Sequence, residues 1–341
     1  MNDRLESFAP AAQVAPGEGP SMPALDALLH GAVDLHHHGF PEFTFDHPTR
    51  QDDAEELRQA DAAGMAGIVM KSHFFPTTSV SWRLNRLGLK AKAFASITMN
   101  PCAGGFLPIA VEAAARQGAK ALFMPTWGAA ADQRRGGFSH HLTEYLVQAR
   151  KLDASKALTV ADASGRIRPE VSECLAIAAE FGMMVATGHV SPDESLAVVQ
   201  EARRLGVREV MFQHPDSRSI GASREDIRQI AAAGGTIEFC AIGFTPAFQR
   251  LPMPECLDII REVGAERVVL TTDCFFGWMP PAPELLRMTL GSMLHHGLTQ
   301  REAALLVRDN PRRLIGLPEW TGEATHEVDE QAAARREPQV A

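Results

Sequence analysis

The chain has 341 residues, of which 42 are acidic and 33 are basic, and its formal net charge is −9 at pH 7. This acidic balance argues against a nucleic-acid binder and against attraction to anionic membranes, because both usually require a basic surface. A hydrophobic content of 45% with 22% charged residues is typical of a globular protein. We therefore expect no nucleic-acid partner and no membrane partner.

Eight short apolar segments of the chain are interpreted as β-strands. They are rich in Val, Ile, Phe and Ala, as strands buried on both faces usually are. The stretches between them have helical spacing, and most of these end in Gly, the residue expected just beyond a helix. In chain order the predicted strands are residues 32–37, 67–73, 93–100, 119–126, 183–190, 209–215, 236–243 and 267–274. The helical stretches include residues 52–64, 107–118, 168–182, 192–206, 223–235 and 253–266.

Strands that alternate with helices predict a parallel sheet covered by helices. Eight such units in roughly 250 residues are typical of a (β/α)8 barrel. We therefore predict an α/β fold, a (β/α)8 TIM barrel over residues 25–318. An open, doubly wound sheet is the rival, and it is disfavoured because no Gly-rich phosphate-binding motif follows the first strand.

The interval between the fourth and fifth predicted strands is longer than the others and predicts an insertion at about residues 128–168. Part of it is predicted to form a small β-hairpin that turns near Ser164 and Gly165. Residues 1–24 and 319–341 are predicted to be a flexible arm and a flexible tail. The start does not resemble a signal peptide, and the five cysteines lack metal-binding or redox spacing, so we expect a cytoplasmic protein.

Polar side chains recur at the carboxyl ends of the predicted strands, which is where (β/α)8 enzymes place their catalytic groups. On the first strand, alternation puts His36 and His38 on one side and His37 on the other. Two imidazoles on one side of a strand end are able to hold a metal ion. The full set comprises His36, His37, His38, Lys71, His73, His189, His214 and Asp273.

The order and spacing of these groups resemble the amidohydrolase superfamily. Its signature is His-x-His on strand 1, His on strands 5 and 6, and Asp on strand 8 of a (β/α)8 barrel. Residues 298–318 are similar to the final helix of that superfamily, and the resemblance spans about residues 25–318. More narrowly, residues 71–77, 97–127 and 186–192 resemble the DUF6282 family. The resemblance implies an enzyme with one or two divalent metal ions, the first held by His36, His38 and Asp273 and the second by His189 and His214.

The implied metal centre departs from the usual pattern at strand 4. Many superfamily members bridge two metals there with a carboxylated lysine or a glutamate, whereas residues 122–127 offer neither. Lys71 on strand 2 is a substitute, because its carboxylation by CO2 would supply a bridging carboxylate. The alternatives for Lys71 are an ammonium that holds a substrate carboxylate and an ion pair with Asp273. Mixed imidazole and carboxylate ligands favour zinc, with manganese, iron and cobalt as alternatives.

The implied chemistry is hydrolysis by metal-activated hydroxide. Asp273 is the expected general base and acid, and His214 is expected to bind the second metal or, with one metal, to contact the substrate. Aromatic residues beyond the strand ends predict a partly apolar pocket, so a small amide, lactam, ester or lactone is the expected substrate. The expected substrate contacts are His73, Asn100, Trp127, Arg218 and Phe275.

Two other functions remain open at this point. A mononuclear decarboxylase of the same superfamily is compatible with the gap at strand 4, since it would need one metal ion. A non-catalytic binding protein is disfavoured, because the ligand positions on strands 1, 5, 6 and 8 are all filled. The resemblance also implies a homo-oligomer.

Overall fold

The computed structural model describes residues 20–140 and 156–322. The strands are β1 (Val33–His38), β2 (Gly67–Lys71), β3 (Lys92–Phe94), β4 (Ser96–Thr98), β5 (Ala121–Phe123), β6 (Met184–Ala186), β7 (Val210–Phe212), β8 (Thr236–Cys240) and β9 (Val268–Thr271). The helices are α1 (Met22–Leu29), α2 (Asp53–Ala62), α3 (Thr78–Leu84), α4 (Pro108–Arg116), α5 (Ala130–Arg135), α7 (Pro169–Glu180), α8 (Pro192–Arg204), α9 (Arg224–Ala232), α10 (Met253–Val263), α11 (Ala282–His295), α12 (Gln300–Ala304) and α13 (Asn310–Leu314).

The strands form two parallel sheets, one of order β1-β2-β3 and the other of order β4-β5-β6-β7-β8-β9. The third predicted strand is divided into β3 and β4, which are separated only by Ala95. At the other end, β1 lies beside the chain that follows β9. A single parallel bridge pairs His37 with Cys274 there, and the Asp273 amide donates to the His36 carbonyl at 2.8 Å. The prediction of an α/β fold with parallel strands is confirmed.

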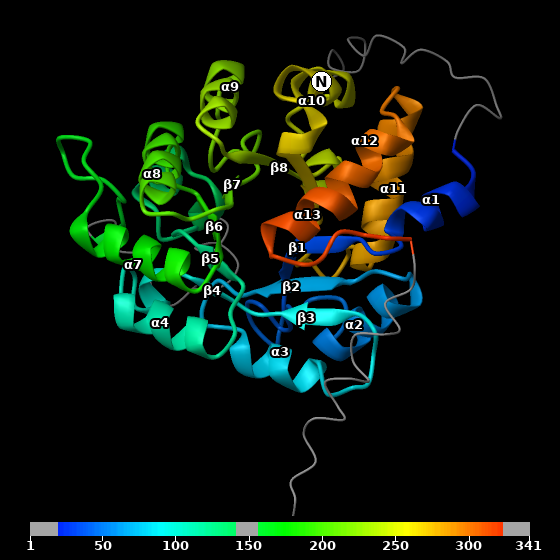
Figure 1. Ribbon diagram of the computed structural model, residues 1–341, viewed down its shortest axis with the longest axis horizontal. Coiled ribbons are helices and arrows are strands. Elements are labelled where there is room, and N and C mark those ends of the chain that lie inside the picture. Colours follow the sequence, from blue (N-terminus) through cyan, green and yellow to red (C-terminus); the bar gives the residue numbers. More distant parts are fainter. Residues whose placement is uncertain (1–19, 141–155, 323–341) are drawn as a thin grey trace, which may run out of the picture.

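The helices lie outside the strands and surround them, as Figure 1 shows. Their apolar sides form one large core with the outward-facing strand residues, among them Ile68, Leu122 and Phe239. A second, smaller core joins the opposite sides of β1, β2, β5, β6, β7 and β9. Leu314 and Ile315 at the end of α13 pack into this second core. Because alternate residues of one strand enter different cores, β5, β6 and β7 are apolar throughout, while β1, β2 and β8 also carry buried polar residues.

Helix α8 illustrates how the sequence fixes the limits of a helix. Ser191 accepts a hydrogen bond from the amide of Glu194, whose carboxylate accepts from the Ser191 amide in return. This capping box satisfies two amides that have no partner inside the helix. Acidic residues in the first turn and Arg203 and Arg204 in the last turn both complement the helix dipole. The helix therefore begins and ends close to where the pattern predicts.

The structure describes only part of the predicted insertion and termini. Residues 1–19, 141–155 and 323–341 lie outside the described residues, so the predicted arm, tail and insertion are covered in part. Near the predicted hairpin, one antiparallel bridge pairs Ala161 with Ile167. The hairpin and the domain limits stay predictions. In the described ranges, each helix is too short or too polar to cross a lipid bilayer.

Candidate metal centre

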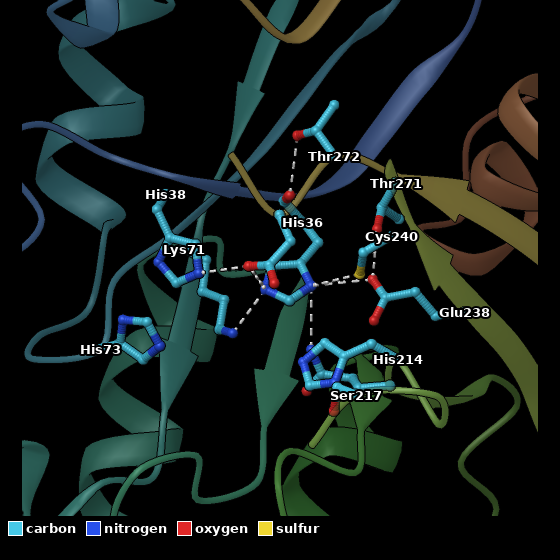
Figure 2. A network of polar contacts seen from close by, with 12 residues as sticks. His36, His38, Lys71, His73, His214, Ser217, Glu238, Cys240, Thr271 and Thr272 are labelled. Atoms are coloured by element: carbon cyan, nitrogen blue, oxygen red, sulfur yellow. Dashed lines mark hydrogen bonds and ion pairs between the residues drawn. The ribbon is translucent and has the colours of Figure 1, made fainter. Parts of the chain in front are cut away.

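The predicted ligands meet at the carboxyl ends of the strands, as Figure 2 shows for His36, His38, Lys71 and His214. His36 and His38 belong to β1, and Lys71 is the last residue of β2. His189, His214 and Asp273 follow β6, β7 and β9 within three residues. The imidazoles and the lysine are at most 6% exposed, and the Asp273 side chain is 15% exposed.

Asp273 is at the centre of the group. Its Oδ1 lies 3.0 Å from His36 Nε2 and 3.1 Å from His38 Nε2. Lys71 Nζ lies 2.8 Å from the same His36 Nε2. Side-chain atoms of His36, His214 and Asp273 that are able to bind a metal all lie within 4.8 Å of one another. The His189 ring is next to that of His214, with 4.9 Å between their centroids. The structure therefore brings all six predicted ligands together.

The two imidazoles of β1 each have a buried glutamate beside Nδ1. His36 Nδ1 lies 3.0 Å from Glu238 Oε1, on β8, and both side chains are fully buried. The Thr271 hydroxyl donates to the same Glu238 oxygen at 2.8 Å. His38 Nδ1 lies 3.1 Å from Glu42 Oε1. In both rings the carboxylate is near Nδ1, while Nε2 faces Asp273.

The other two imidazoles repeat this arrangement. Asp132, on α5, lies with its Oδ2 2.7 Å from His189 Nδ1. The Ser217 hydroxyl lies 3.1 Å from His214 Nδ1. Histidines that bind metals usually have their second nitrogen held in this way, because the outer partner fixes the tautomer and the ring orientation. All four imidazoles are thus positioned to offer the remaining nitrogen, Nε2, to a metal ion.

The backbone near the site adopts conformations that are uncommon elsewhere. In the described ranges, three residues other than glycine have positive φ angles, namely Glu42 (61°), His214 (20°) and Asp273 (52°). Such conformations cost free energy and are concentrated at functional sites. Gly188 also has a positive φ, and a Cβ there would come within 2.4 Å of the Pro125 carbonyl oxygen. Only glycine therefore lets the chain bring His189 to its place.

Burial and charge shift the pKa values of the central groups. Burial disfavours charge on Lys71 and lowers its pKa, although Asp273 and Glu238 act in the other direction. Burial also lowers the pKa of His214 to about 3, and His189 contributes to this shift. Burial opposes charge on His36 as well, but Asp273 and Glu238 raise its pKa to about 9. The two carboxylates thus make this a place where positive charge is stabilised.

His73 lies beside the centre and is covered by aromatic rings. Its Nδ1 pairs with Glu42, and its ring stacks on that of His38 at a centroid distance of 4.3 Å. On its other side it stacks on Phe138 at 4.8 Å, and Phe43 lies 5.9 Å away. Phe275 packs edge-on against His38 at 5.3 Å. We call Phe43, Phe138 and Phe275 the aromatic cover.

The other predicted substrate contacts have different surroundings. Asn100 donates to the His73 carbonyl and the Thr126 hydroxyl and accepts from two amides, so the protein itself uses its polar atoms. Trp127 is 7% exposed, and its indole nitrogen has no hydrogen-bond partner among the described residues. Arg218 is exposed and lines a hollow whose lining includes none of the aromatic-cover residues. Asp34, on β1, accepts hydrogen bonds from the backbone amides of His36 and Thr272 and makes none to an imidazole among the described residues.

The sequence did not identify Glu42, Asp132, Glu238 or Cys240 as site residues. The Cys240 thiol lies 3.9 Å from His36 Nδ1, behind the ring. For Glu238 a signal existed, because an acidic residue inside the apolar segment of residues 236–243 must be paired when the strand is buried. No comparable signal marks Glu42 or Asp132, which lie in segments outside the predicted strands.

The donor set fits a divalent metal ion. It combines imidazoles that each have an outer polar group near Nδ1 with a carboxylate that contacts two of them. Zinc prefers three or four ligands of these two kinds. Asp273 remains ionised, since His36 and His38 hold its pKa well below the ordinary range in spite of burial. The residues present are therefore suitable for the metal that the sequence predicts.

Comparison with known families agrees with this geometry. The profile of DUF6282, described as a family of unknown function, matches residues 31–238, which is more than half of the chain. The chain belongs to the DUF6282 family. No curated protein matches it in sequence. The narrow resemblance that was predicted from residues 71–77, 97–127 and 186–192 is thereby confirmed.

Solved structures share the fold of this DUF6282 protein at low sequence identity. An amidohydrolase from Pseudomonas aeruginosa is similar with a TM-score of 0.54 and 13% identity, over 86% of this chain and 98% of that chain. A variant of an organophosphorus hydrolase has a TM-score of 0.53 and 15% identity, over 85% and 94%. A 2,6-dihydroxybenzoate decarboxylase has a TM-score of 0.50 and 12% identity, over 84% and 100%. The fold is therefore that of amidohydrolases and their decarboxylase relatives.

Proposed function

We propose that this protein is a metal-dependent hydrolase of a small, partly apolar molecule, and that it cleaves an amide, lactam, ester or lactone bond. One observation carries the proposal. Four buried imidazoles each have an outer carboxylate or hydroxyl oxygen within 3.1 Å of Nδ1, and they gather around Asp273 at the carboxyl ends of the strands. A purely structural histidine cluster would not need an outer partner on every ring.

In this proposal His36, His38 and Asp273 hold one divalent ion, and His189 and His214 hold a second. When bound, such an ion polarises a carbonyl group and lowers the pKa of a coordinated water. Asp273 accepts the proton of the attacking water at its carboxylate and returns it to the leaving group. Lys71 fits the role of a carboxylated bridge, because its amine is buried and its lowered pKa favours the neutral form that reacts with CO2.

The aromatic cover and Trp127 are the proposed substrate contacts, together with His73. The cover is apolar and lies directly over His38 and His73, which supports a substrate with an apolar part. The unpaired Trp127 indole is able to donate a hydrogen bond to a polar group of the substrate. We also propose that the strands close into an eight-stranded barrel, which the bridge between His37 and Cys274 supports. Zinc is the proposed metal; the homo-oligomer and the cytoplasmic location stay predictions.

A mononuclear decarboxylase is the second candidate, and one observation favours it. The chain beyond β5 continues as Met124, Pro125 and Thr126, which offer no carboxylate and no lysine to a second metal. If Lys71 stays an amine, one metal ion held by His36, His38 and Asp273 is the simpler arrangement. The similarity of fold to a decarboxylase is compatible with this reading.

The test is to load the purified protein with zinc, count the metal ions per chain and measure turnover on matched panels. One panel contains small amides, lactams, esters and lactones, and the other contains aromatic carboxylic acids monitored for CO2 release. We expect hydrolysis of at least one member of the first panel and its loss in Asp273→Asn. Hydrolysis that persists in Asp273→Asn would contradict the proposed general acid and base. CO2 release without hydrolysis would replace the first candidate by the second.

A further inference from the structure

A hollow with a chemical character of its own is lined in part by Ser217, the residue that contacts His214. Its volume is about 410 Å³, and it is lined by Arg135, Asp216, Ser217, Arg218, Gly221 and Arg250. Three of these six residues are arginines, from three segments that are distant in the sequence. One acidic side chain faces them, so the lining carries a surplus of positive charge. We call it the arginine hollow.

The guanidinium groups of these three arginines form no ion pair with another described residue. Within residues 20–140 and 156–322, no carboxylate oxygen comes within ion-pair distance of Arg135, Arg218 or Arg250. Elsewhere on the surface most arginines that contact a neighbour do pair with an acid, as Arg204 does with Glu201. The positive charges of three unpaired arginines around one hollow repel one another unless an anion binds between them. The hollow therefore has the charge of an anion-binding site.

Arg135 is held in place by the backbone and not by a counter-ion. Its Nε donates to the Arg218 carbonyl at 3.4 Å, and a terminal nitrogen donates to the Gly221 carbonyl at 3.2 Å. A Cβ on Gly221 would come within 1.6 Å of that nitrogen, so the close approach depends on glycine at this position. The guanidinium is thus fixed before a ligand arrives, and its other N–H groups stay available.

Asp216 gives the hollow an acceptor as well. Its Oδ1 is buried and has no hydrogen-bond partner among the described residues. An unpartnered buried carboxylate oxygen is costly, and a ligand that carries a hydroxyl or amine would remove this cost. Ser217, which also lines the hollow, contacts His214 Nδ1 at 3.1 Å, and Figure 2 shows these two residues side by side. The hollow therefore adjoins the metal centre on the outer side of one of its rings.

We propose that the arginine hollow is a binding site for a small carboxylate or phosphate anion that also carries a hydrogen-bond donor. The arginines hold the anionic group, and Asp216 accepts from the donor. This inference does not depend on the hydrolase proposal, because none of the lining residues is a proposed metal ligand. It assigns to Arg218 a place in an anion site and not beneath the aromatic cover.

The experiment is calorimetric titration of the zinc-loaded protein at pH 7.5 with inorganic phosphate, sulfate, glycolate and acetate. Phosphate and glycolate carry a donor, while sulfate and acetate do not. We expect phosphate or glycolate to bind at millimolar concentration or below, at least fivefold more tightly than the matched anion without a donor. The tighter of the two identifies the ligand as a phosphate or an organic acid. Absence of binding by all four anions would overturn the proposal.

Matched variants locate the bound anion. We expect Arg218→Ala and Arg250→Ala each to weaken binding about tenfold, the effect of losing one charge-assisted hydrogen bond. Arg134→Ala, on the same helix as Arg135 but outside the lining, is the control and leaves binding unchanged. In Asp216→Asn we expect phosphate and sulfate to bind with affinities within twofold of each other, and likewise glycolate and acetate. Binding that survives both arginine variants but is lost on removal of zinc places the anion on the metal and refutes the inference.

Discussion

The role of Glu238 leads to the most informative prediction about the metal centre. Glu238 Oε1 lies 3.0 Å from His36 Nδ1, both side chains are fully buried, and Thr271 holds the carboxylate from the other side. Glu238→Gln keeps the size and the Thr271 contact but removes the charge that makes His36 a stronger ligand. Removal of such an outer partner lowers metal affinity about 10- to 100-fold. Because Gln retains an acceptor, we expect about tenfold weaker zinc binding, or about 1.4 kcal/mol.

Glu238→Ala also releases the His36 ring, so we expect it to reach the upper end, about 100-fold or about 2.7 kcal/mol. Zinc affinity is measured by competition with a chromogenic chelator, and circular dichroism checks that each variant is folded. Glu201→Gln is the control, because this carboxylate pairs with Arg204 on the surface, away from the site. Zinc affinity of a folded Glu238→Gln within twofold of the wild type would refute the reasoning.

Three further predictions concern the same centre. In Lys71→Ala we expect the zinc content to fall from two ions per chain to one if the lysine is a carboxylated bridge, and an unchanged content by metal analysis would rule the bridge out. The pKa of Asp132 is lowered from 3.8 to about 2 by its hydrogen bond to His189, even though burial opposes this. The ionised Asp132 therefore contributes fully to the stability of the metal-free protein above about pH 4, and this contribution is lost as the pH falls toward 2. We expect Asp132→Asn to flatten the acid-unfolding curve between these two pH values. An acid-unfolding curve that Asp132→Asn leaves unaltered would contradict the pairing of Asp132 with His189. We expect removal of zinc by a chelator to lower the melting temperature, because zinc at 100 times its Kd stabilises the folded state by about 2.7 kcal/mol. An equal melting temperature with and without zinc would argue against zinc binding at this site.

The sequence predicted well which side chains meet at the strand ends, because periodicity locates strands and the carboxyl ends of parallel strands share one edge. His36, His189, His214 and Asp273 are far apart in the chain, yet the alternation of strands and helices was enough to expect them at one place. Lys71 was found by the same argument. The register between β1 and β2 is irregular, however, and shifts between Asp34 and His37. Simple alternation along a strand fails across such an irregularity.

The carboxylates that lie beside the Nδ1 atoms of the histidines could not be predicted in the same way. Glu42 and Asp132 reach their histidines from loop and insertion segments, and the conformation of such segments is set by tertiary contacts and not by a periodic pattern. The positive φ of Glu42 shows how far its local conformation departs from the preference of an isolated residue. Arg135, Arg218 and Arg250 likewise come together only through packing. Charge in a sequence is therefore informative about a site only after the fold has placed it.

The aromatic cover has a consequence for how relatives of this protein could diverge. Phe43, Phe138 and Phe275 come from three separate segments of the chain, and none of them coordinates the ion in the proposed arrangement. Substitutions of these rings alter the shape and polarity of the space over His38 and His73, while the imidazoles and the carboxylates beside them stay intact. The chemistry and the choice of substrate are therefore encoded in different parts of the chain. Exchange of the segments that carry these three residues would therefore change the selectivity and leave the proposed metal-binding residues unchanged.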